Sequence, residues 1–158
     1  MSAAEMPDSP GTHTTFHIER RTRPAPGEIE QLRDRLSAFN RSQIPNKGYV
    51  PIFLRLISDD GTFSGGLNGY VSYGWLFIET LWIADSARLQ GLGTSLMLAA
   101  EKEARKHGCE RAWVDTFSFQ ARRFYEKLGY VVFGELEEYP PGHSRYFLRK
   151  ELEIEITT

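Results

Sequence analysis

The first half of the chain contains short runs rich in strand-forming side chains, separated by turn residues and by one helical segment. Asp59-Asp60-Gly61 is a strong turn signal and predicts that the two runs beside it form a hairpin. Ile29, Leu32, Leu36 and Phe39 recur at helical spacing and define one apolar stripe. We therefore predict a helix at residues 27–40 and strands at residues 16–21, 49–57, 63–73 and 75–83.

Helical and strand patterns alternate in the second half of the chain. One helix is predicted at residues 91–107, where apolar residues share one face and Gly108 ends the pattern. A second helix is predicted at residues 119–128, with Phe124 and Tyr125 on its inner face. The remaining strands are predicted at residues 112–117, 130–136 and 145–149.

This order of elements predicts the fold class. A strand, a helix and a strand in succession make strands 75–83 and 112–117 parallel, through a right-handed crossover. The hairpins on either side of this unit add antiparallel strands, so we expect a mixed α/β sheet covered by helices. We expect one domain at residues 15–158, preceded by a flexible tail at residues 1–14.

Composition narrows the function classes. The formal net charge is −2 and the pI is about 6.1, so the basic footprint of a nucleic-acid-binding protein is missing. The most apolar stretch, residues 75–84, is too short for a bilayer and contains Glu79, so we expect no membrane span. Cys109, interpreted as a small strand-edge residue, is the only cysteine; this precludes an internal disulfide and suits a cytoplasmic location. We expect no metal.

The most informative segment is the turn Arg88-Leu89-Gln90-Gly91-Leu92-Gly93-Thr94-Ser95, between a predicted strand and a predicted helix. Glycines allow the backbone to approach a ligand closely, and the free N–H groups of a helix N-terminus attract anions. The helix carries no acidic residue before Glu101, which leaves its start open to an external phosphate. The segment lacks the lysine of a phosphate loop, and Leu96 stands where a dinucleotide fingerprint has its third glycine. A tight turn without a ligand is the alternative.

Two motifs in this region carry a family resemblance. Leu81-Trp82-Ile83 followed by Arg88-x-x-Gly91-x-Gly93 resembles the acetyl-CoA signature of the GNAT superfamily of N-acetyltransferases. Residues 121–130, with the sequence ARRFYEKLGY, resemble the Phe-Tyr-x-x-x-Gly-Phe helix end of the same family. The order of elements is similar as well. The resemblance implies the acyl-CoA N-acyltransferase fold, in which a splayed parallel pair lies in a mostly antiparallel sheet.

By this resemblance acetyl-CoA is the expected co-substrate. Leu81 and Ile83, with Trp82 between them, would offer backbone groups to the acetyl carbonyl and the pantetheine arm. Ser118 stands where many family members carry an asparagine; its hydroxyl would contact the cofactor or, alternatively, cap the next helix. The pyrophosphate would be held by the backbone N–H groups of Arg88, Leu89, Gln90, Gly91, Leu92, Gly93 and Thr94.

Tyr125 and Glu79 are the candidate catalytic residues. The resemblance implies that Tyr125 protonates the departing thiolate, because the usual tyrosine pKa of about 10 keeps the hydroxyl protonated at neutral pH. A core aromatic is its alternative role. Glu79 would take the acceptor's proton, directly or through water, and strand alternation predicts that it points to the same side as Leu81 and Ile83. Pairing with an arginine of a neighbouring strand is the alternative role of Glu79, and a proton relay through water alone would then suffice.

The resemblance also places the acceptor beside the first helix and its following turn, the second hairpin and the loop before the last strand, at about residues 39–49, 65–73 and 139–145. Three carboxylates would attract a cationic amine or, alternatively, protect an exposed strand: Glu135, Glu137 and Glu138. An aromatic rim is expected from Tyr73, Trp75, Tyr139 and His143. The expected function is acetyl transfer to a small primary amine in a ternary complex. Acetylation of protein lysines or N-termini and a non-catalytic acyl-CoA-binding module are the alternatives, and a homodimer is expected by analogy.

Overall fold

The computed structural model describes residues 14–46 and 48–153. Contacts divide the chain into two compact units, Met1–Asn40 and Arg41–Thr158. The flexible tail predicted at residues 1–14 lies, apart from Thr14, outside the described residues. The single domain expected at residues 15–158 stays a prediction.

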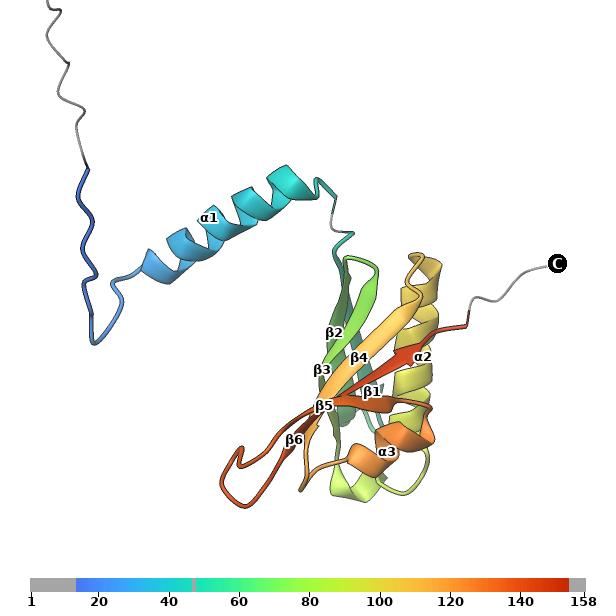
Figure 1. Ribbon diagram of the computed structural model, residues 1–158. Coiled ribbons are helices and arrows are strands. Elements are labelled where there is room, and N and C mark those ends of the chain that lie inside the picture. Colours follow the sequence, from blue (N-terminus) through green and yellow to red (C-terminus); the bar gives the residue numbers. More distant parts are fainter. Residues whose placement is uncertain (1–13, 47, 154–158) are drawn as a thin grey trace, which may run out of the picture. The chain divides into compact units, whose positions relative to one another are not determined.

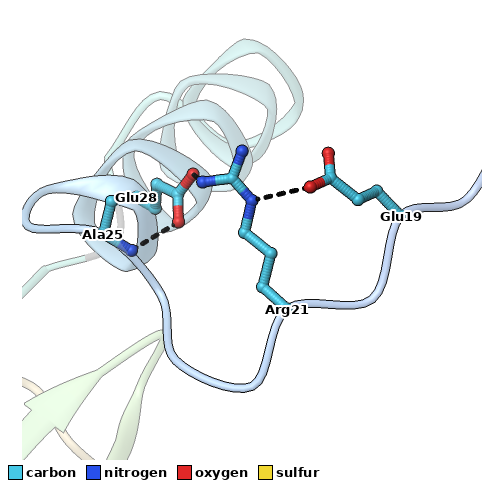
Figure 2. Close-up of polar contacts among 4 residues, drawn as sticks. All are labelled: Glu19, Arg21, Ala25 and Glu28. Atoms are coloured by element: carbon cyan, nitrogen blue, oxygen red, sulfur yellow. Dashed lines mark hydrogen bonds and ion pairs between the residues drawn. The ribbon is translucent and has the colours of Figure 1, made fainter.

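Helix α1 (Glu28–Gln43) lies close to its predicted position. Its first turn is fixed by Glu28, whose carboxylate accepts a hydrogen bond from the Ala25 N–H at 2.6 Å and pairs with Arg21 at 2.8 Å, as Figure 2 shows. The strand predicted at residues 16–21 is wrong, because no neighbouring backbone in the described chain pairs with this segment. A strand needs such a partner for its N–H and C=O groups. The side chains of Phe16 and Ile18 are accordingly exposed.

A six-stranded mixed sheet forms the centre of the second unit, in the order β1-β2-β3-β4-β6-β5 (Figure 1). The expected fold class is confirmed, because β3 and β4 are parallel and the other neighbours are antiparallel. The strands are β1 (Val50–Ile57), β2 (Phe63–Ser72), β3 (Trp75–Ile83), β4 (Arg111–Phe117), β5 (Val131–Leu136) and β6 (Arg145–Glu151).

Helix α2 (Leu92–Lys106) packs against β1, β2 and β3, and Figure 1 shows it along one face of the sheet. Its buried side chains, including Leu96 and Met97, join strand residues such as Leu76 and Leu148 in one core. Cys109 is buried in this core and its thiol lies 3.2 Å from the Gly74 carbonyl oxygen. Burial raises the pKa of the Cys109 thiol, so this cysteine is a packing residue.

Helix α3 (Arg122–Lys127) is shorter than the sequence predicts and packs against β5. Side chains hold the preceding turn in a non-helical conformation. The Phe117 N–H donates to the Gln120 side-chain oxygen at 2.9 Å, and the Ala121 N–H donates to the Thr116 hydroxyl at 3.2 Å. These bonds compete with helical ones, so the helix begins at Arg122.

Strands β3 and β4 pair over only four residues and then diverge. Their last pair is Ile78 with Val114, although β3 continues to Ile83 and β4 to Phe117. A bulge at Glu79 bends β3 at the same point, since Asn68 of β2 pairs with Thr80 whereas Gly69 pairs with Ile78. The predicted splay of the parallel pair is therefore present, and it opens the sheet.

Candidate active site

A cavity lies where β3 and β4 diverge. It has a volume of about 740 Å³ and is lined by residues 78–83 of β3 and 114–116 of β4. Arg88 and Gly93 contribute from the glycine turn, and Phe124 and Tyr125 from α3. Side chains from four separate elements thus meet at one place.

This cavity reaches both faces of the sheet. Val114 and Thr116 are buried on the core side, so alternation along β4 directs Asp115 to the opposite face. Tyr125 belongs to the core cluster on the first face, whereas Glu79 bonds the exposed Asn68 on the second. The site can therefore receive one ligand from the helical side and another from the opposite side.

The glycine turn begins α2 with free backbone donors. Gly91 is the N-cap with a φ of 73°, and a Cβ added there would meet no atom within 4 Å. Leu89 also adopts a left-handed conformation, with a φ of 62°, and its side chain is fully exposed. No acceptor in the described part of the chain contacts the N–H of Leu92, Gly93 or Thr94. Since the first helical turn also lacks acidic side chains, an anion would meet several free donors there.

Gly93 and Arg88 connect this turn to the cavity. A Cβ on Gly93 would lie 3.3 Å from the Phe124 ring, so any larger residue there would crowd the packing between α2 and α3. The Arg88 side chain donates to the Ile83 carbonyl oxygen at 3.2 Å and pairs with Asp85 at 2.8 Å. Arg88 thus ties the turn to the end of β3, in addition to the backbone role predicted for it.

Tyr125 lines the cavity and is also part of the core. Its ring meets Phe124 and Tyr130 edge-on, with centroid distances of 5.1 and 6.0 Å, and only 6% of the residue is exposed. Burial, with a smaller contribution from the negative charge of Asp115, raises the pKa of Tyr125 to about 12. The two alternatives from the sequence are therefore compatible: the ring packs, and the hydroxyl stays protonated at neutral pH.

Glu79 occupies the bulge of β3 and lines the same cavity. Its carboxylate accepts a hydrogen bond from the Asn68 side-chain amide at 2.7 Å, so its partner on the neighbouring strand is an amide and not an arginine. Leu81 and Ile83 pack against the core. The expectation that Glu79 points to their side is wrong, because the extra residue in the bulge changes the alternation.

Ser118 lies apart from the cavity. Its hydroxyl is 3.2 Å from the His143 Nδ1 and accepts a hydrogen bond from the Ser144 N–H at 3.2 Å. Ser118 is not the N-cap of α3, since that position is Ala121. It lines a second hollow of about 370 Å³ together with Glu135, Glu137, Glu138 and His143.

The aromatic residues expected on the acceptor side form two separate groups. Tyr139 and His143 pack edge-on against Phe117 and Phe119, at the splayed end of β4. Tyr73 and Trp75 lie at the other end of β3, where Trp75 pairs with Arg111. A single rim made by all four is therefore wrong, because Tyr73 and Trp75 lie before the point where β3 and β4 diverge, whereas Tyr139 and His143 lie at the splayed end beyond it.

Among the predicted cofactor residues, Leu81, Trp82, Ile83, Arg88 and Gly93 line the cavity. Leu89, Gln90, Gly91, Leu92 and Thr94 make up the adjoining turn and the helix start. Sequence reasoning missed Asp115, which lines the cavity from β4. A signal existed: Asp115 is a charged residue between Trp113 and Phe117 on one face of a predicted strand.

No helix in residues 14–46 and 48–153 has the length and apolarity needed to cross a membrane.

Comparisons with known proteins agree with this architecture. Residues 12–130 match the Acetyltransferase (GNAT) family. The chain is 35% identical over 127 residues to an acetyltransferase of Agrobacterium fabrum, covering 80% of this chain and 93% of that protein. It is 42% identical over 93 residues to the blasticidin-S acetyltransferase of Streptomyces morookaense, covering 58% and 68% respectively. The crystal structure of an acetyltransferase from Bacillus cereus is 34% identical with a TM-score of 0.78, covering 87% of this chain and 98% of that chain.

Proposed function

Because this chain belongs to the GNAT family of acetyltransferases, we propose that it transfers the acetyl group of acetyl-CoA to a primary amine of a small acceptor, by direct attack in a ternary complex. Acetyl-CoA is the co-substrate of this family of enzymes. The observation that carries the proposal is the single cavity in which the glycine turn, Tyr125 and Glu79 meet. The similarity to a blasticidin-S acetyltransferase supports a small acceptor.

The chain's own residues fit this co-substrate. Its pyrophosphate is an anion, and the free N–H groups of Leu92, Gly93 and Thr94 are suitable donors at a helix N-terminus. Beyond Ile78, the edge of β3 that faces β4 has no ladder partner among the described strands. The backbone groups of Leu81 and Ile83 would therefore form hydrogen bonds to the extended pantetheine arm, which would take the place of a neighbouring strand.

The bound thioester supplies an activated acetyl group, and the protein supplies proton transfer around it. Glu79 would accept the proton of the acceptor ammonium, directly or through a water, which leaves a neutral amine able to attack. Tyr125 would donate its proton to the departing sulfur, since its raised pKa of about 12 keeps the hydroxyl protonated. The two groups lie on opposite faces of the sheet, as two ligands approaching from opposite sides require.

Acetyl-CoA binding tests the first part of the proposal. The Gly91→Glu variant should bind acetyl-CoA at least about 100-fold more weakly in calorimetry, because its carboxylate would stand where the pyrophosphate is expected. Gly108→Glu is a matched control: Gly108 has a φ of 72°, and its Cβ would also meet no atom within 4 Å. Equal losses in the two variants would point to backbone strain instead of a phosphate site.

Thiol release with a panel of amines tests the second part. Wild-type protein should release CoA from acetyl-CoA only when a small amine is present. Binding without release across polyamines, amino acids and aminoglycosides would instead favour a non-catalytic module. Acetylation of peptides alone would contradict the small acceptor. Cytoplasmic location and a homodimer stay predictions.

The Glu79→Gln variant should lose about 10²-fold in turnover at neutral pH, because the amide cannot accept a proton. The loss should shrink as the pH rises, since the acceptor amine then deprotonates in solution. Initial rates between pH 6 and pH 10 measure this. Unchanged turnover and an unchanged pH profile would remove Glu79 from the mechanism.

A further inference from the structure

A second carboxylate stands opposite Glu79 at the point where the strands divide. The last parallel pair joins Ile78 and Val114, so Glu79 and Asp115 are the first residues beyond it on the two strands. Both line the same cavity. The point just beyond the Ile78–Val114 pair, here called the fork, is therefore flanked by one carboxylate from β3 and one from β4.

Arg145 holds Asp115 through only one of its two oxygens. The Arg145 Nε donates a hydrogen bond to Asp115 Oδ1 at 2.8 Å, and Arg145 Nη2 forms an ion pair with the same oxygen at 2.6 Å. Asp115 Oδ2 has no partner in the described part of the chain and keeps its capacity to accept a hydrogen bond. Since the Asp115 side chain is 17% exposed, a ligand in the cavity can reach this region.

The orientation of Arg145 is fixed by its surroundings. Its guanidinium lies 5.2, 5.6 and 5.6 Å from the ring centroids of Phe117, Tyr139 and Phe147. The three rings, the hydrogen bond and the ion pair hold the Asp115 carboxylate in place before any ligand arrives. With Arg145 included, the fork carries two negative charges and one positive charge, which favours a cationic ligand.

We propose that Asp115 is the residue that determines acceptor specificity: its free oxygen binds a second cationic group of the acceptor, while Glu79 faces the amine that reacts. The inference rests on the proposed function and adds the acceptor class. That class is a small amine with a second ammonium or guanidinium group. Such a group makes a charge-assisted hydrogen bond to Asp115, and a hydroxyl in its place makes a weaker one.

Matched acceptors test this directly. Diamines and the amino alcohols of equal length differ only in the remote group. Wild-type enzyme should favour the diamine about 10- to 100-fold in kcat/KM, mainly through KM, as expected for a hydrogen bond to a charged group. The Asp115→Asn variant should bring that ratio close to one and leave the acetyl-CoA Kd unchanged.

Two further variants separate specificity from folding. Glu151→Gln breaks a comparable pair between β4 and β6, the Arg111–Glu151 pair at 3.1 Å, away from the cavity, and should preserve the diamine preference. Arg145→Gln should lower the preference only in part, because Asp115 keeps its charge but loses the partner that orients it. A ratio that stays at the wild-type value in Asp115→Asn, or that falls equally in Glu151→Gln, overturns the inference.

The outcomes distinguish this inference from the proposed function. Wild-type release of CoA with diamines and amino alcohols at equal kcat/KM would overturn the role of Asp115 and leave the acetyltransferase assignment in place. No release with any amine would overturn the proposed function and this inference together.

Discussion

Replacing Tyr125 by phenylalanine should lower kcat about 10²- to 10⁴-fold, the usual contribution of a positioned general acid. The variant keeps the ring that packs against Phe124 and Tyr130, and loses only the hydroxyl. Acetyl-CoA affinity should therefore stay close to the wild-type value. Single-turnover rates with saturating acetyl-CoA and acceptor, together with calorimetry, measure the two quantities separately.

Tyr130 provides the matched control, because it is a second buried tyrosine in ring contact with Tyr125. Its hydroxyl donates a hydrogen bond to Glu101 at 3.0 Å, and Tyr130 is not among the residues that line the cavity. Tyr130→Phe should thus lower stability and leave kcat unchanged. A wild-type kcat in Tyr125→Phe would exclude the acid role and leave this residue as part of the core alone.

The pH profile adds an independent check on Tyr125. A group whose pKa is raised to about 12 keeps its proton at every pH below that value, so it remains a donor across the assay range. Wild-type rate should not fall between pH 8 and pH 10 through loss of this proton. A decline there that disappears in Tyr125→Phe would contradict the raised pKa.

The Lys150→Met variant should lose about 3–5 kcal/mol of unfolding free energy, because it leaves a buried carboxylate without its cation. Lys150 bonds both oxygens of Glu101, at 3.0 and 2.8 Å, and the Glu101 side chain is only 3% exposed. The Tyr130 hydroxyl completes this cluster between α2 and β6. Urea denaturation at neutral pH measures the loss.

Lys106→Met is the control, because the Lys106–Glu103 pair at 2.8 Å lies on the surface, and its loss should leave the denaturation midpoint unchanged. Replacing Glu101 and Lys150 together by methionine should restore much of the stability. A single variant as stable as wild type would mean that water or another group compensates Glu101.

The sequence determined the elements whose signals are local. Helix α2 follows its N-cap Gly91, whose left-handed φ of 73° favours the glycine that the motif contains, and it ends at Lys106, just before Gly108. The order of strands and helices predicted the parallel pair of β3 and β4, since chain connectivity restricts handedness. These features depend on neighbouring residues or on chain order, which a single sequence contains.

Only the tertiary structure decided features that join distant residues. The strand predicted at residues 16–21 failed because strand formation needs a partner that local pattern does not specify. The bulge redirected Glu79 toward Asn68, and the pair of Asp115 with Arg145 joins residues 30 positions apart. The buried Glu101 is likewise neutralised by Lys150, which lies 49 positions later in the chain. Burial and pairing of charges depend on which strands become neighbours, and that is set by the packing of the whole sheet.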